Sequence, residues 1–268
     1  MAIASFDNYP HKTLKIELPI IKGNYILIKI SNKISGWTIS KIYGAGTINV
    51  LAIATYETII YYVDNDNNKK ELTKFNLTRD GFYDLGIDPK TKKSKIVNRS
   101  SEPLKEINIK AIATVDYADT YGAYALDPFD IEELPRDFDY FTDGEPISYK
   151  VKRKSPKTAA DVMIHIGGYY TKAKGSKHRI GGTYGCYGVI SPKMVFSTWK
   201  EANAWEKKAI DVINDKNSLT PLDKGTPSNR EQNRLVNTIN SAIKKYGNNK
   251  TEIYVNIQKN SKRRKIIK

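Results

Sequence analysis

The sequence VMIHIGG at residues 162–168 and the sequence GTYGCYGVI at residues 182–190, joined by a basic loop, carry the strongest indication of the fold. Apolar side chains at positions 162, 164 and 166 alternate as in a β-strand with one buried face, so His165 lies on the other face with Met163. Cys186 follows His165 by 21 positions, which is long enough for the chain to return. We therefore expect a second strand beside the first, with His165 and Cys186 brought together.

Outside this region, period-two alternation and short apolar runs predict strands, and apolar residues at three- and four-residue steps predict helices. Ser228 is expected to cap the second helix and Gly247 to end it. An Asp/Asn cluster at 64–68 predicts a hairpin turn between two strands. The predicted strands are 13–18, 25–30, 58–63, 71–77 and 252–257, and the predicted helices are 194–213 and 228–246.

Residues 116–145 are acidic and aromatic, and Pro128 and Pro135 argue against a long helix there. The acidic residues do not follow the spaced-ligand pattern of a calcium-binding loop. The composition therefore predicts a solvated loop, or a lid over a site.

The composition is that of a globular protein with a strongly basic surface. The chain has 268 residues, 40% of them hydrophobic, and a net charge of +15, which attracts nucleic acid, anionic lipid or an anionic cell wall alike. One cysteine excludes an internal disulfide. We find neither a signal-peptide pattern nor an apolar run long enough to span a bilayer, so an export route is not evident.

The glycines around Cys186 suit a nucleophile, because they permit unusual dihedrals and leave turn N–H groups free to bind an oxyanion. A base such as His165 would convert the thiol into the reactive thiolate. Basic residues of the intervening loop, Lys172, Lys174 and Arg179 among them, would attract substrate carboxylates. A lone cysteine is usually a small buried hydrophobe and a lone histidine in a strand is usually structural, so the pair alone does not decide the function.

His165 followed by Thr183-Tyr184-Gly185-Cys186-Tyr187-Gly188 resembles the signature of the L,D-transpeptidase (YkuD-like) catalytic domain. That signature is a His, roughly 14–17 residues, Ser/Thr-His-Gly-Cys, a variable residue, and Gly, Asn or Arg. Two features depart from it: Tyr184 replaces a second His, and the interval is at the long end of the range. The motif covers about 30 residues, and a looser correspondence of strand order covers about residues 45–258.

The resemblance implies a mostly β (α+β) fold, a sandwich or barrel with two helices after the cysteine. It implies an N-terminal β extension at 1–44, a catalytic domain at 45–258 and a basic tail at 259–268. Cys186 would be the nucleophile and His165 the base. Oxyanion and pocket residues would be Thr183, Tyr184, Gly185 and Tyr187, and substrate would contact Gly167, Gly168, Lys172, Lys174 and Arg179.

The implied substrates are peptidoglycan stem peptides in the periplasm or cell wall, processed without a metal or cofactor. Transpeptidation, carboxypeptidase or endopeptidase hydrolysis and D-amino-acid exchange all stay open. Divergent relatives with such a Tyr include secreted toxins, which implies an interbacterial effector with delivery machinery and an immunity protein as partners. The alternative is a non-catalytic basic protein that binds nucleic acid or an anionic wall polymer. The absence of a nucleic-acid motif and the spread of the charge argue against nucleic acid.

Overall fold

The computed structural model describes residues 21–44, 50–87, 89–90, 92, 94–98, 100–115, 122–131, 137–139, 148–150, 158–171, 178–182, 185–206, 228–247 and 251–260. Its strands are β1 (Tyr25–Lys41), β2 (Tyr43–Gly44), β3 (Val50–Val63), β4 (Lys69–Thr78), β5 (Phe82–Ile87), β6 (Ser94–Asn98), β7 (Ile107–Val115), β8 (Gly122–Leu126), β9 (Phe129–Asp130), β10 (Asp137–Asp139), β11 (Ser148–Lys150), β12 (Thr158–Ala159), β13 (Met163–Ile166), β14 (Gly168–Thr171), β15 (His178–Gly181), β16 (Tyr187–Ile190) and β17 (Glu252–Ile257). Its helices are the 3-10 turn η2 (Pro192–Met194), α1 (Trp199–Ala204) and α3 (Asn229–Tyr246).

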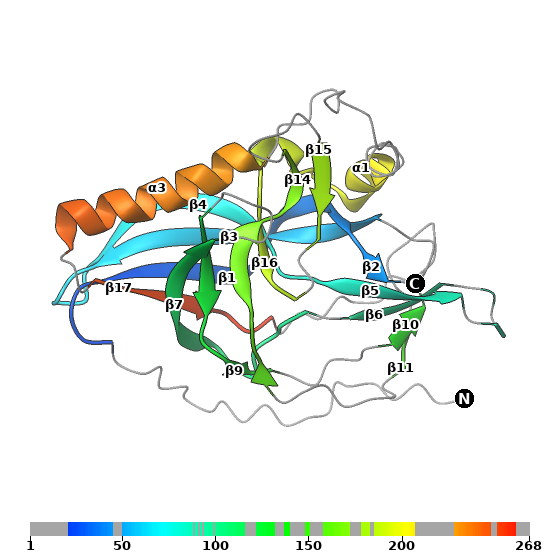
Figure 1. The fold of residues 1–268 in the computed structure, drawn as a ribbon, viewed down its shortest axis with the longest axis horizontal. Coiled ribbons are helices and arrows are strands. Elements are labelled where there is room, and N and C mark those ends of the chain that lie inside the picture. The colour runs from blue at the N-terminus through cyan, green and yellow to red at the C-terminus, as the bar shows by residue number, and fades with distance from the viewer. Residues whose placement is uncertain are drawn as a thin grey trace.

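Eight strands close into a barrel in the order β1-β17-β7-β8-β13-β16-β4-β3, and α3 lies along one side of it (Figure 1). The fold is therefore mostly β, as predicted, and the two α-helices in the described residues follow Cys186. A five-stranded sheet, β11-β10-β6-β5-β2, lies beside the barrel (Figure 1). None of the described helices is long and apolar enough to cross a membrane.

The main core lies between the barrel strands and one face of α3. Leu235, Ile239 and Ala242 recur at steps of four and three residues, so they form one apolar stripe, and all three are buried in this cluster. Gly122 on β8 lets the helix approach, because a Cβ there would lie 3.0 Å from Val236. A second cluster joins β1, β14, β15, β16 and η2 through Ile39, Tyr169, Ile180, Ile190 and Met194.

Several predicted strands are confirmed, including the hairpin of β3 and β4 around the cluster at 64–68 and the last strand, β17. The predicted strand 13–18 lies outside the described residues. The domain boundary at 44/45 does not divide the fold, because β1 is a barrel strand paired with both β3 and β17.

The prediction of a loop or lid at 116–145 is wrong for its described first part, since β8 is a barrel strand between β7 and β13. The buried side chains of Ala123, Tyr124 and Leu126 lie in the sequence between Asp116 and Asp119 on one side and the exposed Asp127 on the other. The acidic composition of the whole segment therefore concealed a short apolar strand.

The predicted helices need two corrections. The first begins only at Trp199, because Thr198 and Glu201 form a reciprocal cap there. Helix α1 runs to Ala204, and residues 207–213 of the predicted helix lie outside the described residues. Ser228 precedes α3 as predicted but does not cap it with its side chain. Its hydroxyl instead accepts a hydrogen bond from the N–H of Ser191, at 3.1 Å, and so attaches the start of α3 to the end of β16.

Candidate active site

The predicted pair of strands exists, and its two strands are parallel neighbours. In β13 and β16, Ile164 pairs with Tyr187, His165 with Gly188 and Ile166 with Val189. Between β13 and β16 in the sequence, the strands β14 and β15 pair with each other as an antiparallel hairpin. The chain therefore returns as the 21-residue spacing predicted.

The Cys186 sulfur lies at the start of β13, two residues before His165 along the strand. Ile164 and Ile166 are buried in or beside the core, whereas Met163 and His165, on the other face of β13, are half-buried. Continuing the register by one residue sets Cys186 beside Met163, and the N–H of Met163 lies 3.4 Å from the Cys186 sulfur. Strand geometry of about 3.3 Å per residue and about 4.8 Å between strands gives a Cα separation of roughly 8 Å between His165 and Cys186. The sulfur itself contacts the backbone of Asp161 and Met163, which precede His165 along the chain.

The imidazole of His165 is oriented by the backbone. Its Nδ1 lies 2.7 Å from the carbonyl oxygen of Ile166, which can only accept, so we assign the proton to Nδ1. This tautomer leaves the lone pair on Nε2. A neutral histidine held in this way can accept a proton at Nε2 without a carboxylate partner.

Backbone turns of unusual conformation lie on both sides of the sulfur. Gly185 has φ +102°, a left-handed value that favours glycine, directly before Cys186. Asp161, before β13, has φ +57°, and its carbonyl oxygen lies 3.8 Å from the Cys186 sulfur. The sulfur thus has one N–H donor and one carbonyl acceptor from the start of β13. The N–H of Met163 stabilises negative charge on it.

Three glycines allow the strands to approach closely beside the site. A Cβ on Gly167 would lie 2.7 Å from the Cα of Gly188, and one on Gly168 would lie 2.9 Å from the Cδ1 of Ile190. Gly168 also has a left-handed φ of +58°. Gly167 and Gly168, predicted to contact substrate, are buried and give the close packing of β13 and β14 on β16.

The side chain of Tyr187, a predicted pocket residue, points away from Cys186 into the core. It is fully buried, its hydroxyl donates to the Ser101 carbonyl at 2.9 Å, and burial raises its pKa well above the usual 10. Only the backbone of Tyr187 can therefore line the site. Its anchoring fixes the strand that directly follows Cys186.

Beneath Tyr187 lies a buried ion pair that the sequence did not indicate. Nη2 of Arg79 donates to both oxygens of Glu102, at 3.1 and 3.2 Å, and to the carbonyl of Gln258. Nη1 of Arg79 donates to the carbonyl of Ser31. Both side chains are almost completely buried. No motif distinguishes these residues from the other charged residues in the sequence. Their importance follows only from burial, and they connect β4, β1 and the end of β17 below the candidate site.

Five predicted site residues remain, and the structure describes only one of them, Arg179. Thr183, Tyr184, Lys172 and Lys174 lie outside the described residues. The backbone of Arg179 lies in β15 opposite Tyr170. Among the described residues, no three His, Cys, Asp or Glu side chains are grouped so as to hold a metal ion.

No family model matches the chain, and neither a curated protein nor a solved structure matches it.

Proposed function

We propose that the protein is a cysteine acyltransferase or peptidase of the L,D-transpeptidase type that acts on peptidoglycan stem peptides. The observation that carries the proposal is the parallel register of β13 and β16, which pairs His165 with Gly188 and brings Cys186, directly before β16, to the start of β13. The backbone contact of His165 Nδ1 supports the role of base, because Nε2 keeps its lone pair. The signature around residues 183–188 supplies the substrate class.

In the proposed reaction, Nε2 of His165 takes the thiol proton as the Cys186 sulfur attacks a peptide carbonyl carbon. N–H groups of the turn at Gly185 and Cys186 would bind the oxyanion of the tetrahedral intermediate. The intermediate collapses by breaking the C–N bond. The imidazolium gives its proton to the leaving amine, and a thioester remains on Cys186.

A second nucleophile then releases the acyl group from the sulfur. An amine gives a transpeptidation or exchange product, and water gives a trimmed stem peptide. Most members of the proposed family have a histidine where this chain has Tyr184, and a tyrosine, with a reference pKa near 10, is not a base at neutral pH. We therefore assign all proton transfer to His165. We further propose an effector role in which stems are trimmed or exchanged rather than cross-linked.

The catalytic pair is tested by the alkylation of Cys186 with iodoacetamide across pH 6–9, followed by intact-protein mass. His165→Ala should slow alkylation below about pH 8, because the thiolate loses its partner. Met163→Leu is the matched control, since it changes the neighbouring side chain on the same face and keeps the base. Equal rates for wild type and His165→Ala across the range would remove His165 from the base role and favour a non-catalytic protein.

A further inference from the structure

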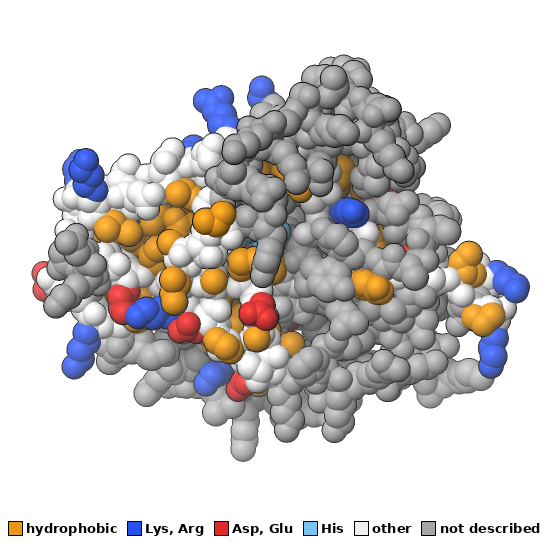
Figure 2. All heavy atoms as spheres, in the orientation of Figure 1, with side chains coloured by type: hydrophobic (Ala, Val, Ile, Leu, Met, Phe, Trp, Pro, Cys, Tyr) orange, Lys and Arg blue, Asp and Glu red, His pale blue; other side chains and the backbone are white. Residues whose placement is uncertain are grey.

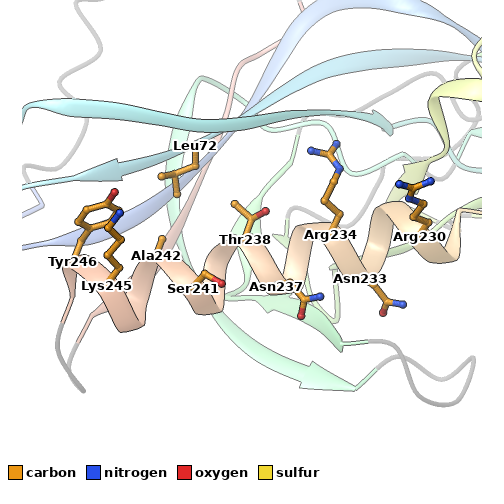
Figure 3. A pocket seen from close by; sticks show the side chains of 10 residues that line it. All are labelled: Leu72, Arg230, Asn233, Arg234, Asn237, Thr238, Ser241, Ala242, Lys245 and Tyr246. Atoms are coloured by element: carbon orange, nitrogen blue, oxygen red, sulfur yellow. The ribbon is translucent and has the colours of Figure 1, made fainter.

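A groove beside α3 does not identify a ligand. It has a volume of about 900 Å³ and lies over Leu72 of β4 and the exposed side of the helix (Figure 3). Arg234 closes it toward β4, because its guanidinium donates to the hydroxyl of Thr73 and to the carbonyl of Lys74. On the face drawn in Figure 2, the described Lys and Arg side chains lie scattered rather than gathered into one patch. Neither shape nor charge therefore indicates one class of ligand there.

The surroundings of Cys186 are more informative, because Cys186 lies just beyond the paired part of β16. The ladder with β13 begins at Tyr187, and the ladder with β4 begins at Gly188, so Cys186 precedes both. The ends of paired elements open more readily than their interiors. The position of the Cys186 sulfur therefore depends on how firmly Tyr187 is held.

Tyr187 is held by a short segment, residues 100–104, which we call the brace. The hydroxyl of Tyr187 donates to the carbonyl of Ser101 at 2.9 Å, and both residues are buried. The next residue, Glu102, is fixed by Arg79, whose Nη2 lies 3.1 Å from its Oε2. A buried ion pair of this kind is costly to break. The carbonyl that anchors Tyr187 is therefore fixed by its neighbour in the chain.

The brace also holds a strand on the other side of the site. Pro103 forms a β-bridge with Ile131, and the N–H of Leu104 donates to the carbonyl of Asp130 at 3.3 Å. Asp130 belongs to β9, which pairs with β12, and it lies opposite Thr158 of that strand. Two residues of the brace are therefore bonded to the β9–β12 pair.

The strand β12 leads directly into the turn that contacts the sulfur. Asp161 follows the end of β12 by two residues, and its carbonyl oxygen lies 3.8 Å from the Cys186 sulfur. Met163, which begins β13, brings its N–H to 3.4 Å from the same sulfur. The brace is thus connected to both sides of the sulfur, through Tyr187 on one side and through β9 and β12 on the other.

We propose that the brace positions the Cys186 thiol by fixing the start of β16 relative to the turn at Asp161, so that the N–H of Met163 stays directed at the sulfur. Tyr187 and Leu104 are then positioning residues, which act through the backbone around the sulfur and not on a substrate. This role rests on the proposed function, in which Cys186 is the nucleophile. A fixed N–H donor favours the thiolate, so loosening the brace should make the thiol less reactive at neutral pH.

Tyr187→Phe tests the first connection, because it removes the hydroxyl that reaches Ser101 and keeps the buried ring. Alkylation of Cys186 with iodoacetamide is followed by intact-protein mass across pH 6–9. The variant should react about threefold or more slowly at pH 7, and the midpoint of its profile should lie at higher pH. Tyr124→Phe is the matched control, since Tyr124 is also buried in the barrel but lies outside these connections.

The control should keep the wild-type profile. Urea unfolding of both variants separates positioning from stability, because a merely structural role would lower the unfolding midpoint of Tyr187→Phe and leave its alkylation profile unchanged. An unchanged profile in Tyr187→Phe, or an equal shift in Tyr124→Phe, would overturn the proposal.

Leu104→Pro tests the second connection with the Tyr187 hydroxyl intact. Proline lacks the N–H that donates to Asp130, so the brace loses its bond to β9 and the alkylation profile should shift in the same direction. Leu104→Ala is the matched control: the Leu104 side chain is exposed, and alanine keeps the N–H, so the wild-type profile should remain. Identical profiles for the two Leu104 variants would overturn the connection through β9.

These measurements distinguish a wrong brace from a wrong function. If the brace is wrong, the variants alkylate as the wild type does, and the wild type still alters muropeptides. If the proposed function is wrong, the wild type leaves muropeptides unaltered, while Tyr187→Phe and Leu104→Pro still shift the alkylation profile.

Discussion

Gly167→Ala tests how the candidate site is held together. The added methyl group would lie 2.7 Å from the Cα and 2.9 Å from the carbonyl carbon of Gly188. These are backbone atoms that cannot rotate away, so β13 and β16 must separate locally. Overpacking costs about 1–3 kcal/mol, and the stiffer unfolded chain returns about 0.4–1 kcal/mol, which leaves a net loss centred on about 1.3 kcal/mol.

The assay has two parts, urea unfolding and the rate of Cys186 alkylation at pH 7. Because His165 pairs with Gly188, displacement of Gly188 should also weaken the His165–Cys186 arrangement and slow alkylation several-fold. Gly23→Ala is the matched control: Gly23 has a left-handed φ of +92° and nothing within 4 Å of an added Cβ. It should lose about 1–2 kcal/mol through strain alone and keep the wild-type alkylation rate. Unchanged alkylation in Gly167→Ala, with a stability loss no larger than about 0.5 kcal/mol, would refute the reasoning.

Two further predictions concern buried charge. Glu102→Gln leaves Arg79 buried without its carboxylate, so it should lower the free energy of unfolding, measured in urea, by about 3–5 kcal/mol. The control Glu71→Gln removes a carboxylate from an exposed pair and should cost at most about 1 kcal/mol. Equally small losses of unfolding free energy in the two variants would contradict this prediction. Burial raises the pKa of Glu206 from 4.5 to about 7. The folded protein therefore keeps this proton to higher pH than the unfolded chain, and the resulting stability, full below about pH 4.5, is lost as pH rises through about 7. Glu206→Gln should flatten the fall in unfolding free energy across this window, and an identical slope in the variant would show that Glu206 contributes none of it.

Local sequence patterns were sufficient to predict a strand or helix where one face of the element is buried and the other is exposed to solvent. This holds for β13, for the β3–β4 hairpin and for α3, whose apolar stripe repeats at helical steps. They failed for β8, where a buried run of a few residues precedes a long acidic segment. They also could not reveal that β1 and β17 are parallel neighbours, because that pairing joins strands more than 200 residues apart.

For the candidate site, the 21-residue spacing predicted that the chain returns and sets a second strand beside that of His165. The groups that contact the His165 imidazole and the Cys186 sulfur could not be predicted in the same way. The Nδ1 contact of His165 with the carbonyl of Ile166 and the N–H of Met163 at the sulfur are backbone interactions that any residue type supplies. The inward direction of Tyr187 follows from strand alternation, but its anchor at Ser101 depends on tertiary contacts.

The most direct test of the proposed function is mass spectrometry of muropeptides from purified sacculi incubated with the protein. The wild type should shorten tetrapeptide stems or exchange their terminal D-amino acid, and Cys186→Ala, a small change at a half-buried position, should fold normally and do neither. A clean rise in 3,3 cross-links without trimming or exchange would replace the effector hypothesis with ordinary transpeptidation. Unaltered muropeptides with the wild type, or turnover retained by Cys186→Ala, would contradict the assignment of Cys186 as the nucleophile.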